Sequence, residues 1–261
     1  MRFDTPWPER LLSRVEDAGL NASAPPQQRW IDGWLVRTSP GKAKRARCVQ
    51  PVADGRLPVD ERLDLCAALF RDAGLPLFLR ITPFSRPEGL DALLEARGMH
   101  RIDDTRVMVS SEVPVDAVPL PPGYAMERLA AADFAEQVGA MRGSPAAQRA
   151  AHAERLAQSP VPYEGWVLRR REDGRVAACG QVAAEAGLVG IYDVFTDPAE
   201  RGRGLARSLC QNLLAMARAR GAAVAYLQVD AANHAARAVY RRLGFADAYG
   251  YHYRSPEADA H

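Results

Sequence analysis

Apolar positions along the C-terminal half of the chain recur with two periods, one typical of strands and one typical of helices. Runs rich in β-branched and aromatic residues predict strands, and the dipeptide Asp173-Gly174 between two of them is a turn signal. Apolar residues at helical spacing predict helices that stop at Gly221 and Gly244. The predicted strands span residues 125–129, 165–170, 176–184, 188–196, 223–229 and 245–254, and the predicted helices span residues 131–141, 146–158, 205–220 and 233–243.

The N-terminal half shows the last part of this pattern once more. Gly74 and Gly98 follow two predicted helices and are 24 positions apart, while Gly221 and Gly244 are 23 positions apart. This agreement is consistent with a duplicated unit, although two copies are too few to establish a repeat. The elements predicted here are a helix at residues 58–73, a strand at 77–81, a helix at 87–97 and a strand at 105–110.

A proline-rich segment, residues 113–123, separates the two halves. It contains four prolines and has no helical period, which favours an extended connector. We therefore predict a first domain at residues 1–112, the linker at 113–123, a second domain at 124–254 and a flexible polar tail at 255–261.

Composition and charge narrow the classes of function. Hydrophobic residues make up 48% and charged residues 25% of the chain, which is typical of a folded globular protein. The 34 basic residues nearly balance the 32 acidic ones, so the sequence has no electrostatic footprint for nucleic acid or for an anionic membrane. The first residues lack the apolar stretch of a signal peptide, and no run reaches the ~18 apolar residues of a membrane span. We expect a cytoplasmic protein.

The cysteines do not indicate a metal site. They are far apart, include no C-x-x-C pair and have no clustered histidines beside them, which favours neither zinc nor a disulfide framework. We expect reduced, mostly buried thiols at Cys48, Cys66, Cys179 and Cys210.

The segment Arg201-Gly202-Arg203-Gly204-Leu205-Ala206 follows an apolar strand and begins a predicted helix. Helix N-termini present free N–H groups and a partial positive charge, and glycines let the backbone approach phosphate oxygens closely. Two arginines add charged donors. The segment therefore predicts a phosphate site, although a solvated basic turn would have the same composition. It is not a Walker loop, because no Gly-Lys-Ser/Thr follows, and it lacks the spacing of the dinucleotide fingerprint.

A second candidate is the pair Asn233 and Tyr240. Their separation of seven residues is two helical turns, so both side chains, with Ala236 and Arg237 between them, lie on one face of the predicted helix. One face can contact one ligand. Taken alone, Tyr240 could instead be a packing residue with its hydroxyl at the surface.

In this order the two motifs resemble those of the GNAT superfamily of acyl-CoA-dependent N-acetyltransferases. Residues 194–206 (VFTDPAERGRGLA) look like the family's strand, loop and helix start with its Arg/Gln-x-x-Gly-x-Gly/Ala signature. Residues 233–245 (NHAARAVYRRLGF) look like its second motif, which ends in Tyr-x-x-x-Gly-Phe. The resemblance covers most of residues 121–254. It implies an α/β (mixed α+β) fold of two GNAT-like domains, each with a twisted, mixed, mainly antiparallel sheet flanked by helices.

The resemblance also implies acetyl-CoA as the acyl donor, an amine as the acceptor and no metal. The segment 201–206 would hold the pyrophosphate, main-chain groups of Val194 and Thr196 would pair with the pantetheine arm, and Asn233 would help to hold that arm. Tyr240 would be the acid that protonates the departing thiolate, and the ordinary tyrosine pKa of ~10 suits that role.

The attacking amine must be neutral, so a base or a water is needed to take its proton. Asp193, on the strand before the loop, is the first candidate, and Glu185 is the second. Asp193 could instead anchor the substrate or be a solvated side chain on the outward face. His234 lies one residue off the face that carries Tyr240, so we expect it at the surface, and His252 is not assigned a catalytic role.

Residues 1–112 resemble the first half of tandem acetyltransferases in a degenerate form. Aligned on the stop glycines, Leu94 and Pro87 stand where the second half has its tyrosine and its asparagine. The first long helix opens with Asp60 and Glu61, whose charges suit the helix dipole but repel a pyrophosphate. This domain is expected to shape the acceptor pocket or to stiffen the pair.

The leading interpretation is an N-acetyltransferase that moves an acetyl group directly from acetyl-CoA to a primary amine of a small molecule or a protein. The alternative is a non-catalytic acyl-CoA-binding regulatory module. A DNA-binding regulator is disfavoured by the balanced charge and by the lack of a helix-turn-helix pattern. No motif indicates which amine is the acceptor or what the oligomeric state is.

Overall fold

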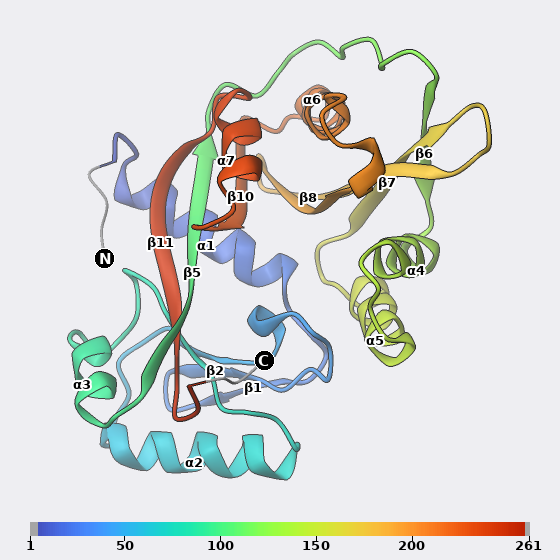
Figure 1. Cartoon of the computed structure of the whole chain (residues 1–261). Helices are drawn as coiled ribbons and strands as arrows, with labels where there is room; N and C mark the ends of the chain where they lie inside the picture. Colours follow the sequence, from blue (N-terminus) through green and yellow to red (C-terminus); the bar gives the residue numbers. More distant parts are fainter. Residues whose placement is uncertain (1–4, 259–261) are drawn as a thin grey trace.

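A computed structural model describes residues 5–258, and its strands form one sheet (Figure 1). Across these residues eleven strands lie in the order β1-β2-β3-β4-β11-β5-β10-β9-β8-β7-β6. The pairs β3–β4 and β10–β9 are parallel, and the other neighbours are antiparallel. The predicted mixed, mainly antiparallel α/β fold is confirmed.

The bounds of the elements are as follows. The first half contains α1 (Glu9–Ala22), β1 (Gln28–Ile31), β2 (Trp34–Arg37), the short 3₁₀ helix η1 (Lys44–Ala46), β3 (Val49–Pro51), α2 (Val59–Asp72), β4 (Leu79–Ile81), α3 (Leu90–Ala96) and β5 (His100–Ser110). The second half contains β6 (Tyr124–Leu129), α4 (Ala131–Met141), α5 (Ala146–Ala157), β7 (Tyr163–Arg170), β8 (Val176–Glu185), β9 (Leu188–Thr196), η2 (Pro198–Glu200), α6 (Leu205–Ala219), β10 (Val224–Asp230), α7 (His234–Arg241) and β11 (Ala246–Ser255).

Every helix and strand predicted from the periodicity is present; α4 and β9 have the predicted bounds, and the other elements have shifted ends. The helix expected from residue 87 begins only at Leu90, because Gly89 adopts a left-handed conformation (φ 78°) at its N-cap. The expected terminal strands are one long strand, β11. The tail predicted from residue 255 begins inside that strand, and residues 259–261 lie outside the described residues. Helix α1 and strands β1 to β3 were not predicted.

The two halves exchange their last strands. Strand β5 of the first half pairs with β10 of the second, while β11 of the second half pairs with β4 of the first, and β5 and β11 pair with each other. The order α2–β4–α3–β5 repeats as α6–β10–α7–β11. All four stop glycines have the positive φ expected of helix C-termini. The same order of elements therefore occurs twice, and both occurrences lie in one continuous sheet.

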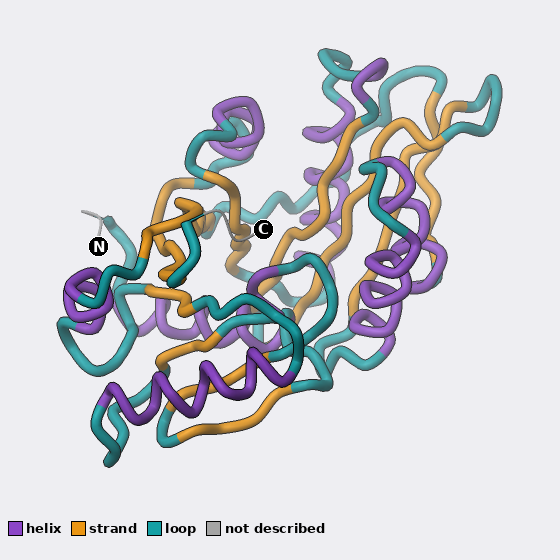
Figure 2. Tube along the Cα trace, turned by 60° about the horizontal axis from the view of Figure 1, so that its bottom comes forward, coloured by secondary structure: helices purple, strands orange, loops and turns teal. Residues whose placement is uncertain are grey.

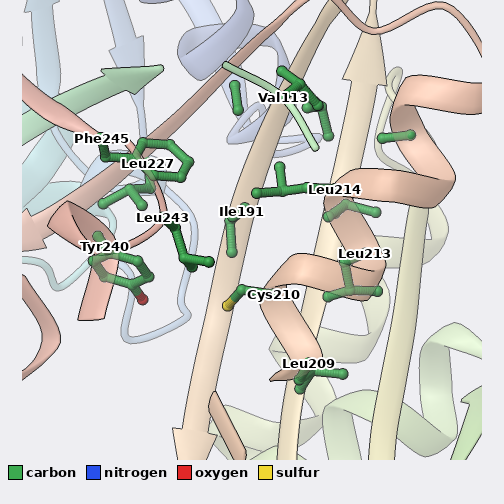
Figure 3. Packing of buried hydrophobic residues seen from close by; sticks show 14 of the residues in the cluster. Val113, Ile191, Leu209, Cys210, Leu213, Leu214, Leu227, Tyr240, Leu243 and Phe245 are labelled. Atoms are coloured by element: carbon green, nitrogen blue, oxygen red, sulfur yellow. The ribbon is translucent and has the colours of Figure 1, made fainter. Parts of the chain in front are cut away.

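Side chains alternate between the two faces of the sheet in the second half. Leu168, Ala178 and Leu227 pack in the cluster that contains α6, whereas their neighbours Val167, Cys179 and Tyr226 pack on the other face with α4 or α1. Figure 3 shows Cys210 of α6 next to the strand that carries Ile191, and Leu209, Leu213 and Leu214 of the same helix belong to the same core cluster. Helices lie on either side of the strands in Figure 2.

The predicted linker has no helix or strand between Ser110 and Tyr124. It is nevertheless anchored, because Val113 is buried in the α6 core cluster and the N–H of Val118 donates to Oδ1 of Asn212 at 3.2 Å. In the described part of the chain, none of the helices combines the length and the apolar character needed to cross a bilayer.

Candidate functional site

Strands β9 and β10 run side by side at one end and separate at the other. Their parallel pairing extends from Leu188↔Val224 to Ile191↔Leu227 and then stops. Beyond it, β9 remains paired with β8, and β10 remains paired with β5. A cavity of about 290 Å³ is lined by both separated ends. Because β10 no longer pairs with β9 there, the edge of β9 has main-chain groups that an extended ligand can use.

A β-bulge at Asp193 accompanies the separation. The register of β8 and β9 shifts between Cys179 and Gln181, and Asp193 has a φ of +51°, which is unusual for a residue with a side chain. The bulge directs the carboxylate toward α4 and α5, where Oδ1 accepts from Nη1 of Arg142 at 2.8 Å. The sequence indicated an acidic residue at this strand but not the bulge.

Three side chains surround the Asp193 carboxylate. Besides Arg142, Nε2 of Gln181 donates to Oδ2 at 2.6 Å, and Nε2 of His152 lies 3.3 Å from the same oxygen. Burial alone would raise the pKa of Asp193, but His152 and Arg142 outweigh it and hold that pKa well below its usual range. A carboxylate with a lowered pKa has a low affinity for protons.

The loop before α6 has the conformation expected of a helix-terminal anion site. Gly202 and Gly204 have φ values of +80° and +74°, and a Cβ placed on either would meet nothing within 4 Å. The segment from Arg201 to Gly204 is exposed. Free N–H groups at the start of α6 therefore face open space, which fits a phosphate ligand.

The Arg203 side chain is already engaged, which the motif did not indicate. Its Nη1 donates to the hydroxyl of Tyr124 at 3.2 Å and lies 3.1 Å from Oε2 of Glu200. The buried Glu200 carboxylate also accepts from Tyr124 at 2.5 Å and from Arg170 at 2.9 Å. Hydrogen bonds from Tyr124 and Arg170 lower the pKa of Glu200. Arg203 therefore braces the loop although its side chain is partly exposed, and Arg201 is the arginine of this loop that forms no such ion pair within residues 5–258.

Helix α7 contributes Asn233, Ala236 and Tyr240 to the lining of the 290 Å³ cavity, as their spacing predicted. Arg237 is directed elsewhere, because its Nη2 donates to Oδ2 of Asp247 at 2.5 Å. Asn233 is the N-cap of the helix, with Oδ1 accepting from the N–H of Ala236 at 3.0 Å. Its side-chain oxygen thus has a structural task as well.

Tyr240 is mostly buried and packs edge-on against Phe245, with ring centroids 6.1 Å apart. Figure 3 shows its ring next to Leu243. Within residues 5–258 the hydroxyl has no hydrogen-bond partner, although the side chain lines the cavity. Burial raises the pKa of Tyr240 above its ordinary value, so the phenol remains protonated at neutral pH.

A second cavity, of about 340 Å³, adjoins the first. Both are lined by Arg142, Arg155 and Asp193. Helices α4 and α5 form one wall of the larger cavity, and a loop of the first half, residues 39–46, contributes the other. His152 lies here, and sequence reasoning missed it because α5 carries no motif.

The remaining sequence candidates lie elsewhere. Glu185 ends β8 and accepts from Nδ2 of Asn21 at 3.2 Å, outside both cavity linings. His234 is exposed, as predicted. His252 is buried, and its Nε2 lies 2.9 Å from Oδ1 of Asp91.

The corresponding region of the first half is filled by its own side chains. The carboxylate of Asp32 accepts from the N–H groups of Arg56 at 3.0 Å and Leu57 at 2.8 Å, just before α2. Where β3 and β4 separate after one pairing, Glu16 of α1 forms a buried ion pair with Arg80. An internal carboxylate thus occupies the place where the second half presents free N–H groups.

The cysteines are free and buried, as predicted. Burial raises the pKa of each thiol to about 12, which makes them poor nucleophiles. Among residues 5–258, no three His, Cys, Asp or Glu side chains come together in a way that could hold a metal ion.

Comparisons with known proteins find acetyltransferases among the similar sequences. Residues 128–245 match the model of the acetyltransferase (GNAT) family. The chain is 25% identical over 231 residues to the uncharacterized N-acetyltransferase YobR of Bacillus subtilis (strain 168), covering 87% of this chain and 91% of that protein. It is 29% identical over 195 residues to the mycothiol acetyltransferase of Clavibacter michiganensis subsp. michiganensis (strain NCPPB 382), covering 70% of this chain and 63% of that protein.

Solved structures share the fold. A GCN5-related N-acetyltransferase from Kribbella flavida superposes with a TM-score of 0.67 at 19% identity, over 94% of this chain and 95% of that one. A tandem GNAT protein from the clavulanic acid biosynthesis pathway gives a TM-score of 0.58 at 16% identity, over 80% of this chain and 75% of that one. Because these identities are low, they support the fold alone.

Proposed function

The chain belongs to the GNAT family of acetyltransferases, and we propose that it transfers an acetyl group directly from acetyl-CoA to a primary amine of a second molecule. The observation that carries this proposal is the cavity between β9 and β10, which Tyr240 lines together with the unpaired edge of β9. From this cavity, strand β9 continues past the bulge at Asp193 toward the glycine loop before α6.

Acetyl-CoA would bind as the acyl donor along β9. The N–H groups from Gly202 to Ala206 would hold the pyrophosphate, with Arg201 as a further charged donor. Main-chain groups of Val194 and Thr196 would pair with the pantetheine arm like an added strand. Asn233 would help to hold that arm through its amide nitrogen, since its oxygen caps α7.

Tyr240 is proposed as the acid. The amine nitrogen attacks the thioester carbonyl carbon, the C–S bond breaks, and the departing thiolate takes the phenolic proton. A phenol whose pKa is raised by burial remains in the protonated form that this step needs. The lack of another hydrogen-bond partner within residues 5–258 leaves its proton free for the sulfur.

Asp193 and His152 are proposed to receive the amine proton together. The lowered pKa of Asp193 makes it a weak base by itself, so its role is to orient the imidazole and to stabilise the imidazolium, as carboxylates do beside catalytic histidines. Nε2 of His152 lies 3.3 Å from Oδ2 of Asp193, and both residues line the larger cavity.

The first half is proposed to act as a degenerate domain, residues 1–112, that shapes the acceptor site. Its loop at residues 39–46 forms part of the wall of the larger cavity. Its own anion site is closed by Asp32. We therefore expect one acetyl-CoA per chain, bound in the catalytic domain at residues 124–254.

The direct test is to incubate the full chain with acetyl-CoA and a panel of primary amines, and to measure free thiol together with the acetylated amine. Release of thiol in step with amine acetylation supports the proposal. Tight binding of acetyl-CoA without transfer to any amine would favour a regulatory module instead.

Tyr240→Phe tests the acid. Turnover should fall by about 10²–10⁴-fold, the usual contribution of a positioned acid, while the Kd for acetyl-CoA stays nearly unchanged. Tyr253→Phe is the matched control, because Tyr253 is also buried but lines neither cavity. Equal turnover in the two variants would remove the acid assignment.

A further inference from the structure

Cationic side chains from three separate segments line the two adjoining cavities. Lys42 and Arg45 come from the loop of the first half, Arg142 comes from the end of α4, and Arg155 comes from α5. These side chains are far apart in sequence, and they line the same cavities because the two halves of the chain share one sheet.

Three of these cations have no carboxylate to neutralise them. Arg142 is paired with Asp193. Within residues 5–258, however, Lys42, Arg45 and Arg155 have no ion-pair partner. The other carboxylate of the lining, Asp230, accepts from the N–H of its near neighbour Ala232 instead. The cavities therefore carry an excess of positive charge.

The two arginines are held in place by tyrosines. Nη1 of Arg45 donates to the hydroxyl of Tyr251 at 3.1 Å, and that hydroxyl donates to Gln228 at 2.9 Å. The guanidinium of Arg155 lies 5.9 Å from the ring centroid of Tyr163. Nε of Arg45 is buried without a hydrogen-bond partner. Keeping a partly desolvated cation unpaired costs free energy, which a bound anion would recover.

These cations are separate from the proposed phosphate site of the donor. No residue from 197 to 206 lines either cavity. From Asp193 to the end of β9 the strand itself spans roughly 10 Å, and the glycine loop follows beyond η2. An anion held here would belong to a different molecule from the one whose phosphates are held at α6.

We propose that the acceptor is a small primary amine that also carries an anionic group, a carboxylate or a phosphate. Arg45, Arg155 and Lys42 bind the anion, while the amine lies toward Asp193 and His152. This rests on the proposed function and specifies its acceptor. Cavities of about 290 and 340 Å³ suit a small molecule.

The first experiment compares matched acceptors with the full chain and saturating acetyl-CoA. The pairs are phenylalanine and phenylalaninamide, β-alanine and propylamine, and aminoethyl phosphate and ethanolamine. Hydrogen bonds to charged groups predict that kcat/KM favours the anionic member of an accepted pair by roughly 10- to 150-fold. Comparing aminoethyl phosphate with phenylalanine and β-alanine shows whether the site prefers a phosphate or a carboxylate. Preference for the neutral members, or for a lysine-containing peptide, would overturn the inference.

The second experiment uses Arg155→Gln. KM for the preferred anionic amine should rise at least tenfold, while KM for acetyl-CoA and the melting temperature stay near those of the wild type. Arg155→Lys should restore part of the loss. Arg71→Gln, an exposed arginine on α2, is the control.

The two proposals fail in different ways. A rise in both KM values would mean that Arg155 holds the donor, which contradicts the anionic acceptor. Failure of acetyl-CoA to bind, or absence of thiol release with every amine, would contradict the proposed function itself.

Discussion

Gly204 immediately precedes α6, and two substitutions there test the phosphate site. The residue has a φ of +74°, so any side chain is strained, but Asn and Asp tolerate this left-handed region better than other residues do. A Cβ would meet nothing within 4 Å, so neither side chain clashes. Gly204→Asn and Gly204→Asp therefore have nearly the same size and the same backbone strain and differ by one negative charge.

The expected difference in acetyl-CoA affinity between the two variants follows from that charge. A carboxylate about 5 Å from a bound phosphate charge costs about 1 kcal/mol at the dielectric of water and about 3 kcal/mol at an effective dielectric near 20. The Kd for acetyl-CoA should accordingly be about 5- to 150-fold weaker in Gly204→Asp than in Gly204→Asn. The free energy of unfolding of Gly204→Asp should be equal to or higher than that of Gly204→Asn, because Asp is at least as good an N-cap as Asn and its charge suits the helix dipole.

Calorimetry with acetyl-CoA and urea unfolding of both variants provide the measurement. Lower affinity of the Asp variant at equal or higher stability supports an anion site at the start of α6. Raising the salt concentration should reduce the difference, because exposed charges are screened. Equal Kd values for the two variants would refute the reasoning and place the phosphates elsewhere.

Three further substitutions test the scaffold. Glu16→Gln should lower the free energy of unfolding by about 3–5 kcal/mol, as measured in urea, because Arg80 would keep a buried charge without its carboxylate. Gly165→Ala should cost about 1–3 kcal/mol in the same assay, because its Cβ would lie 2.4 Å from Cγ of Phe134 in the core. Asp193→Asn should destabilise the protein most near neutral pH. Because the folded-state pKa of Asp193 lies below the unfolded value of ~3.9, its stabilising contribution is present above about pH 4 and is lost as the pH falls through the folded-state pKa. If the difference in unfolding free energy between the wild type and Asp193→Asn did not shrink in acid, this pH dependence would be contradicted.

Much of the fold was predictable because it depends on short-range spacing. Helical periodicity identified α6, and alternating β-prone runs identified the meander from β7 to β9. The ends of the helices could be predicted because a glycine tolerates the left-handed conformation that follows the last helical turn. Helix α1 was missed, although its buried positions 12, 15, 18, 19 and 22 have helical spacing.

The site was predictable only where its residues lie close together in sequence. Asn233 and Tyr240 share a helix face by geometry alone, and the N–H groups at the start of α6 follow from the loop that precedes it. The hydrogen-bond partners of the polar side chains could not be predicted from sequence spacing. Nothing in the spacing indicated that Arg203 would bond to Glu200 or that Asn233 would cap α7.

The sequence by itself determined the order and type of most elements and the two motifs, because each depends on contacts between residues a few positions apart. Only the tertiary structure decided the exchange of β5 and β11, the bulge at Asp193 and the meeting of Arg45 with Arg155. These features depend on strand register and on packing between segments more than a hundred residues apart, and local periodicity carries no information about either.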